Sequence, residues 1–255
     1  IVNDATVTTA TNYATTLSDT ASVANANIIL GDTSGIVTAV VASDSAANLN
    51  ANLSNATTGL DALTLTVSGI SAVASDLIGL DGKTSVNVKA DGTVNTITGT
   101  ATNIQTVVSA VTIDTKSDVN VTVDSGNATV AQQIAIDTQT TGTITATIAE
   151  GDVTSLKTLT SSGGVHALTI VLTDASASAI DLNTIDSKTS VNVNAGSIVD
   201  ITSSAIADVK TLITNKTTAG IDGNWNVVVS DTTVSAAVHP VFDQIIHNRW
   251  IGQRG

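Results

Sequence analysis

Aspartates next to glycine are the side chains with the clearest potential for chemistry in this sequence. They occur in four turn-like segments, DGK, ADGT, VDSGN and GIDGN, at Asp81, Asp91, Asp124 and Asp222. Calcium ions take about six to eight oxygen ligands, so these turns would bind calcium if several of them converged. The short Asp side chain also caps helices and closes turns by accepting hydrogen bonds from nearby backbone N–H groups. We favour the turn role and keep the four residues as weaker calcium candidates.

Groups for acid–base catalysis are scarce. His166 is the only histidine before residue 238, and no other titratable base lies near it in the sequence. One lysine recurs at the same place in three segments, at Lys83, Lys116 and Lys188, and we expect a solvent-exposed row. A polysaccharide hydrolase or lyase would need carboxylates clustered with such a base. Gly-rich phosphate loops, HExxH, GxSxG and cysteine are also absent, so we predict no enzyme, no catalytic residue and no cofactor apart from calcium.

The charge balance excludes one class of partner. The chain has 9 Lys and Arg against 22 Asp and Glu, which gives a net charge of −13 at pH 7. An acidic surface repels phosphate backbones, so no nucleic-acid partner is expected. No apolar run is long enough to cross a membrane. Only 2% of the residues are aromatic and Met is absent, so the core has to be filled by Val, Ile, Leu and Ala.

Internal repetition is the strongest signal in the sequence. LDGKTSVNVKADG at 80–92 returns as IDSKTSVNVNAG at 185–196 and, more loosely, as IDTKSDVNVTVDSG at 113–126 and IDTQTTGTITATIAEG at 136–151. About eight units of roughly 23–33 residues fill residues 1–237, the range typical of solenoid repeats. We therefore predict one solenoid over residues 1–237.

Each unit is predicted to contain one parallel strand. Apolar residues alternate with polar ones in five segments: Val86 and Val88; Val119, Val121 and Val123; Ile144, Ala146 and Ile148; Val191 and Val193; Trp225, Val227 and Val229. The outward positions between them are polar, at Asn87, Asn120, Thr145, Asn192 and Asn226. Strands stacked in register would align these five residues in one ladder, which is our predicted binding face.

A helical period follows most strands. Apolar residues three to four apart occur at Val73, Leu77 and Leu80; Ile104, Val107, Val108 and Val111; Ile206, Val209 and Ile213, with shorter versions at Leu49 and Leu53 and at Val153, Leu156 and Leu159. Candidate N-caps are Ser71, Thr102, Asp152 and Ser203 or Ser204. The predicted fold is an α/β solenoid with one strand and one short helix per repeat. The alternative is an all-β right-handed parallel β-helix in which the helical segments are strands.

Alternating threonines in TGTITATIA, at 141–149, raise the possibility of ice binding, because flat threonine arrays serve that purpose. The corresponding outward residues of other units are Asn, Lys or Val. On this alignment the array is broken, and we do not expect an ice-binding face.

The segments ASAIDLNTIDSKTSVNVNA at 177–195 and TGTATNIQTVV at 98–108 resemble the β-strand repeats of very large bacterial surface and S-layer-like proteins, especially those of marine cyanobacteria. The resemblance covers residues 28–237. It implies an extracellular or cell-surface location and a scaffold or adhesive role, and it brings no catalytic residues. We expect a structural protein of a surface layer, filament or matrix that associates with itself. The alternative is an adhesin or phage-fibre-like module that binds glycans.

The last residues, 238–255, differ in composition from the repeats. They hold the only Pro and the only Phe, and Phe242, Ile246 and Trp250 recur at spacings that give a helix an apolar stripe. An open solenoid end exposes apolar core and strand edges. We predict a capping or docking segment in which these three residues take part in self-association.

Overall fold

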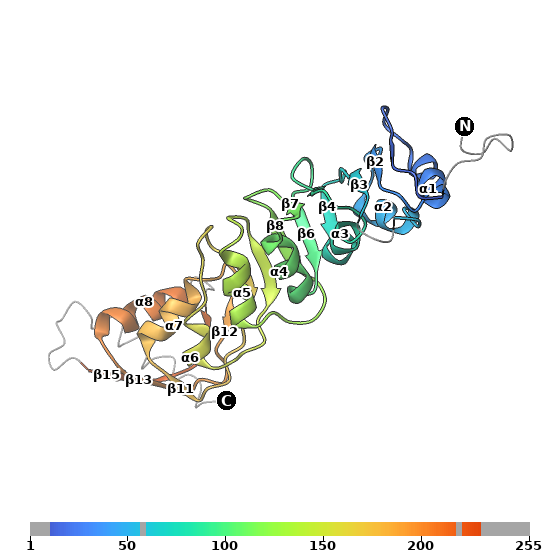
Figure 1. Cartoon of the computed structure of the whole chain (residues 1–255). Helices are drawn as coiled ribbons and strands as arrows, with labels where there is room; N and C mark the ends of the chain where they lie inside the picture. The colour runs from blue at the N-terminus through green and yellow to red at the C-terminus, as the bar shows by residue number, and fades with distance from the viewer. Residues whose placement is uncertain (1–10, 57–59, 218–220, 231–255) are drawn as a thin grey trace, which may run out of the picture. The chain divides into compact units, whose positions relative to one another are not determined.

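The computed structural model describes residues 11–56, 60–217 and 221–230. Short strands and short helices alternate along these ranges (Figure 1). The chain divides into two compact units: unit 1 has residues 1–146 and 162–164, and unit 2 has residues 147–161 and 165–255. The same alternation occurs in both units.

The helices of unit 1 are α1 (Val23–Asp32), α2 (Ala46–Asn52), α3 (Ala74–Asp81), α4 (Ala101–Ser109) and α5 (Val130–Asp137). Its strands are β1 (Thr15–Thr16), β2 (Val37–Val40), β3 (Ala62–Thr64), β4 (Ser71–Val73), β5 (Val88–Lys89), β6 (Thr96–Gly99), β7 (Ile113–Asp114), β8 (Asn120–Val123) and β9 (Ile144–Thr147), whose last residue belongs to unit 2. The elements of unit 2 are α6 (Val153–Leu156), β10 (Ala167–Thr169), β11 (Ser176–Ala177), α7 (Ala179–Asp186), β12 (Val193–Asn194), β13 (Asp200–Ser204), α8 (Ile206–Thr217), β14 (Ile221–Asp222) and β15 (Asn226–Val229).

The strands form several small parallel sheets. In unit 1 the sheet orders are β1-β2-β3, β4-β6-β8-β9 and β5-β7. In unit 2 they are β11-β13-β15 and β12-β14. The prediction of an α/β protein is confirmed, and the all-β alternative is wrong because the segments between strands form helices. Within the described ranges, no helix is long and apolar enough to cross a membrane.

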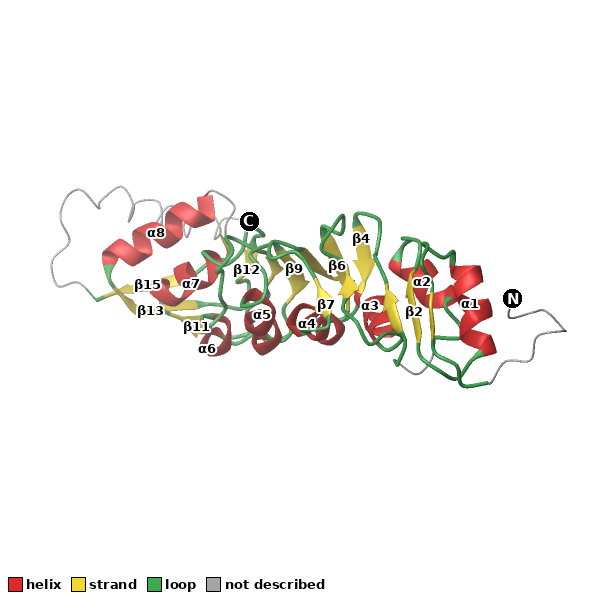
Figure 2. Ribbon diagram, turned by 45° about the horizontal axis from the view of Figure 1, so that its top comes forward, coloured by secondary structure: helices red, strands yellow, loops and turns green. Residues whose placement is uncertain are grey.

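The repeating element is one or two strands followed by a helix, which we call a coil. The coils that end in α3, α4, α5, α7 and α8 have two strands, and those that end in α2 and α6 have one. The coil that ends in α4, for example, begins with β5 and continues with β6. The prediction of one strand per repeat is wrong for the five coils with two strands, because a second strand follows the first, as β6 follows β5 after the bend at 91–93. Within each unit, helices of successive coils lie side by side, as α3, α4 and α5 do in Figure 2.

The core is built from small and branched side chains. Several helices bury two residues three positions apart, such as Leu77 and Leu80 in α3 and Leu182 and Ile185 in α7, each 0% exposed. A helix of only two or three turns gains little stability alone, so this apolar face is what holds it on the sheets. The buried alternation of Val119, Val121 and Val123 and that of Ile144, Ala146 and Ile148 are confirmed.

At the ends of some predicted apolar faces, residues that we expected to be buried are exposed. Val86 and Val191 are each 37% exposed, because the chain bends before strands β5 and β12 begin. Val111 is 88% exposed, because α4 ends at Ser109 and Val111 lies in the connection to β7. Val73 belongs to strand β4, not to helix α3, and its side chain is 43% exposed.

Hydroxyl and carboxylate N-caps start most of the helices. The cap side chain accepts a hydrogen bond from the backbone N–H three residues later, at 2.8–3.2 Å, at Ser22, Ser45, Thr100, Thr129, Asp152 and Ser178. Asp152 is the one cap predicted correctly. Thr102 lies inside α4, Ser71 lies in β4, and Ser203 and Ser204 lie in β13.

A threonine follows α1, α3, α5 and α7 and joins each of these coils to the one before it. Its hydroxyl donates to a carbonyl oxygen of the preceding coil and accepts the backbone N–H two residues further on. We call this arrangement the hydroxyl clasp. Its four copies, with the two distances in that order, are Thr33 to Tyr13 and Gly35 (2.5 and 3.0 Å), Thr84 to Leu63 and Val86 (2.8 and 3.2 Å), Thr140 to Val119 and Gly142 (2.6 and 3.0 Å), and Thr189 to Leu168 and Val191 (2.7 and 3.0 Å).

The residue after each clasp threonine is also a hydroxyl residue and strengthens the same junction. Its backbone N–H and its side-chain hydroxyl both donate to one carbonyl oxygen of the preceding coil. The pairs are Ser34 with Thr11, Ser85 with Asp61, Thr141 with Ser117 and Ser190 with His166. The clasp therefore satisfies backbone groups where the chain passes from a helix into a strand, a place where no regular ladder exists.

Replacing Thr84 by Val tests the clasp. The variant keeps the shape of a buried side chain but removes the donor to the Leu63 carbonyl and the acceptor of the Leu63 and Val86 N–H groups. We expect the free energy of unfolding to fall by about 1–3 kcal/mol in denaturant titrations. Thr106→Val is the control, because Thr106 is exposed and its hydroxyl bonds only within α4. An equal fall in the free energy of unfolding of the two variants would contradict a stabilising role of the clasp.

Candidate functional site

The five predicted binding-face residues are all exposed but do not form one ladder. In unit 1, Asn120 lies in β8 and Thr145 in β9, but the register pairs Thr145 with Thr122. Asn87 precedes β5, in a different sheet. In unit 2, Asn192 precedes β12, whereas Asn226 lies in β15 of another sheet. The ladder prediction is wrong because the similar VNV segments occupy the first strand of one coil and the second strand of another.

Three of these asparagines join neighbouring coils. The Asn87 amide donates to the Val111 carbonyl at 3.1 Å and to the Asp114 carboxylate at 2.8 Å. The Asn226 amide donates to the Asp200 carboxylate at 2.9 Å. The amide oxygen of Asn120 accepts the Thr143 N–H at 2.8 Å. Their side chains therefore already have structural partners.

The observed register gathers hydroxyl side chains on the sheet of β4, β6, β8 and β9. One row across these strands contains Ser71, Thr96, Asn120 and Thr143, and the next contains Val73, Thr98, Thr122 and Thr145. We call these eight residues the threonine face. All are exposed or half-buried. Sequence analysis missed this face because it aligned Asn120 with Thr145, whereas the strand pairing aligns Thr122 with Thr145.

Five hydroxyls of the threonine face are not used in hydrogen bonds with the rest of the described chain. Thr96, Thr98, Thr122, Thr143 and Thr145 form no side-chain hydrogen bond with any part of the chain that the structure describes. The hydroxyls of the clasps and the N-caps, by contrast, each form at least one hydrogen bond with the backbone. None of the eight side chains is charged, so the face offers neutral donors, acceptors and methyl groups to the solvent.

The calcium candidates are spread over separate elements. Asp81 ends α3, Asp91 lies in the bend before β6, Asp124 follows β8, and Asp222 lies in β14. Among the described residues, no three His, Cys, Asp or Glu side chains converge to hold a metal ion. The predicted self-association residues Phe242, Ile246 and Trp250 lie outside the described residues.

The basic side chains of the repeats lie at coil junctions. Lys83 donates to the Leu53 carbonyl at 2.7 Å, and Lys116 donates to the side-chain oxygen of Asn95. His166 is only 1% exposed, and its backbone carbonyl accepts the Ser190 N–H. The expectation of a solvent-exposed lysine row is wrong, because Lys83, Lys116 and Lys188 are half-buried and the first two connect coils.

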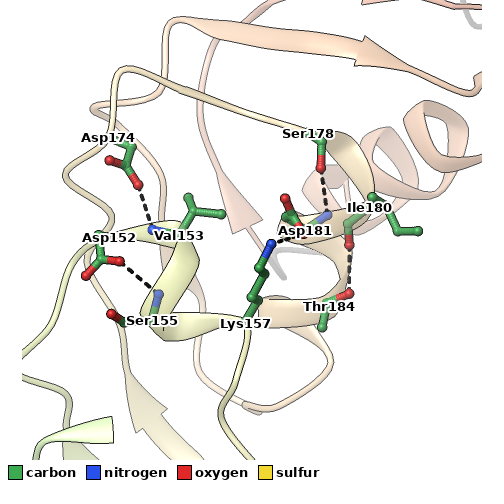
Figure 3. Close-up of polar contacts among 9 residues, drawn as sticks. All are labelled: Asp152, Val153, Ser155, Lys157, Asp174, Ser178, Ile180, Asp181 and Thr184. Atoms are coloured by element: carbon green, nitrogen blue, oxygen red, sulfur yellow. Dashed lines mark hydrogen bonds and ion pairs between the residues drawn. The ribbon is translucent and has the colours of Figure 1, made fainter.

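The charged groups of unit 2 that Figure 3 shows also cap helices or connect coils. Asp152 accepts the Ser155 N–H at 2.8 Å, and Asp174 of the following coil accepts the Val153 N–H at 2.6 Å. Lys157 lies 3.3 Å from Asp181, an ion pair between α6 and α7. Partly exposed pairs of this kind contribute about 0–1 kcal/mol. Carboxylates therefore cap and connect helices here.

Two carboxyl groups of unit 2 have shifted pKa values of opposite sign. The backbone hydrogen bond from Ser155 stabilises the ionised form and lowers the pKa of Asp152. Burial disfavours the ionised form and raises the pKa of Asp186 at the end of α7. In unit 1, a hydrogen bond to Asp32 at 2.6 Å raises the pKa of the Tyr13 hydroxyl.

Comparison of the chain with protein-family models, curated proteins and solved structures gave no match. The function therefore has to be inferred from the residues and contacts described above.

The opposite shifts predict opposite pH dependences. The Asp152 cap stabilises the fold above the ordinary pKa of Asp, and this contribution is lost as the pH falls through its lowered pKa. Asp186 favours the fold below the ordinary pKa, and that contribution is lost as the pH rises through its raised pKa. NMR titration should give a midpoint below the ordinary pKa of Asp for Asp152 and above it for Asp186. Asp186→Asn should remove the loss of stability on raising the pH, and equal midpoints for the two groups would contradict these assignments.

Proposed function

We propose that this chain is a non-enzymatic extracellular structural protein, a component of a surface layer, filament or matrix that acts by self-association. The observation that carries the proposal is the narrow range of offsets in the strand pairing. Paired residues are separated by 22 positions at Thr15 and Val37 and by 28 at Val193 and Ile221, and the other offsets lie between these values. Each strand thus pairs with its equivalent one coil later.

A narrow range of offsets with parallel pairing supports a stack of coils. We propose that the stack is an α/β solenoid of about eight repeats over residues 1–237, with residues 238–255 as a capping or docking segment. Repetition gives each coil the same neighbour contacts, so that length can be added without a new core. Most side-chain hydrogen bonds within the described ranges cap helices, form clasps or connect coils. Such structural use of polar groups is expected of a scaffold.

Exposed aliphatic residues support self-association. They occur in four successive coils of unit 1 just before or at the start of the first strand, at Ile36, Leu60, Val86 and Val111, with exposures of 53, 66, 37 and 88%. We call these residues the aliphatic row. Val86 and Val111 are neighbours because Val88 pairs with Ile113 two residues later. Apolar side chains exposed in a contiguous row are a common feature of protein interfaces.

A glycan-binding adhesin or phage-fibre module remains the second candidate. The exposure of Asn87, Asn120 and Asn192 favours it. The amide of Asn87 and the amide oxygen of Asn120 are nevertheless engaged in coil connections. A glycan pull-down that depends on these three residues would support this candidate over the scaffold.

Self-association is tested by sedimentation and electron microscopy of the purified protein. Because the net charge of −13 makes copies repel each other, assembly into filaments or sheets should increase with protein concentration and with salt, which screens the repulsion. The double variant Leu60→Asp, Val111→Asp should reduce assembly. Ile28→Asp is the matched control, because Ile28 is 50% exposed on α1 and lies outside the aliphatic row. A protein that stays monomeric at every concentration and salt tested would contradict the proposal.

A further inference from the structure

The threonine face combines three properties that together indicate a partner beyond the proposed scaffold role. Its side chains are regularly placed, its hydroxyls have no partner within the described ranges, and it carries no charge. We propose that the threonine face binds the surface of ice.

Regular placement follows from the strand register. Thr98 pairs with Thr122, and Thr122 pairs with Thr145, so three identical side chains stand in one row. Neighbouring parallel strands lie about 4.8 Å apart, and residues two apart along a strand are separated by about 6.6 Å. These spacings are of the same order as the lattice repeats of ice. Thr is β-branched and stiff at χ1, so each hydroxyl and methyl group keeps its position without a large further loss of entropy.

The free hydroxyls provide the hydrogen bonds that such a partner requires. A threonine hydroxyl donates one hydrogen bond and accepts others, as a water molecule does. The hydroxyls of Thr96, Thr98 and Thr122 form no hydrogen bond with other residues in the described ranges. The methyl groups beside them, together with Val73, present apolar surface between the hydroxyls and favour contact with a surface over full hydration.

The absence of charge on the threonine face favours ice over other partners. The chain carries a net charge of −13, yet the eight residues of the threonine face are neutral. An uncharged face complements an uncharged crystal and gives no basis for binding an ionic partner. The face also lacks aromatic rings on which sugar rings could stack, so a soluble glycan fits it less well. The sequence argument against ice binding rested on Asn, Lys or Val at the corresponding outward positions. The structure places Asn87 and Lys89 outside this sheet, whereas Val73 remains in the face at the end of the threonine row and Asn120 in the row beside it.

The test uses the full chain in ice-affinity partition and in ice-recrystallisation assays. The wild-type protein is expected to enter growing ice and to slow recrystallisation, and the double variant Thr98→Lys, Thr122→Lys should reduce both effects at least tenfold. Thr106→Lys is the control, because it introduces a lysine at an exposed position of α4 and should retain the wild-type effects. Circular dichroism would verify that each variant is folded, and Thr122→Val and Thr122→Ser would separate the hydroxyl from the methyl contribution.

Several outcomes would overturn the inference. These are a wild-type protein excluded from ice, a Thr98→Lys, Thr122→Lys variant as active as the control, or binding to an insoluble polysaccharide with the same residue dependence but no effect on ice. Sedimentation of the same variants keeps this test separate from self-association, because neither Thr98 nor Thr122 belongs to the aliphatic row. Loss of ice binding with unchanged assembly would leave the scaffold proposal intact.

Discussion

The hydrogen bonds of a threonine hydroxyl, at the point where the chain leaves a helix and enters a strand, are the interaction on which the rest of the structure depends. At this point the helix no longer supplies backbone partners and the sheet does not yet do so. Thr33, Thr84, Thr140 and Thr189 fill the gap with one donor and one acceptor each. Because the same bonds reach the preceding coil, they also set the register of the strands that follow.

The fold class and several elements were predictable from local patterns. The strict alternation of Val119, Val121 and Val123 defines β8, and the spacing of Leu77 and Leu80 defines part of α3. Helices α1, α5 and α7 were missed, since their small and polar residues give a weak apolar stripe: α5, for example, buries Gln133 beside Ile136. In such helices the cap and the packing determine the structure more than the pattern does.

The candidate site was the part that sequence reasoning placed wrongly. Asn87 and Asn120 stand in nearly identical VNV segments, yet one belongs to the first strand of its coil and the other to the second. The difference lies in the strand pairing, since β5 pairs with β7 whereas β8 pairs with β6 and β9. The row formed by Thr98, Thr122 and Thr145 therefore becomes visible only when the strand pairing is known.

The narrow range of offsets in the strand pairing also has a consequence for the way this chain can be made. Thr96 meets Asn120 only 24 positions later, and no strand pair described above joins residues much further apart. Contacts between residues close in sequence are closed at low entropic cost and form quickly. A growing chain can therefore complete each coil on the one before it as soon as its residues leave the ribosome, without waiting for the far end of the polypeptide.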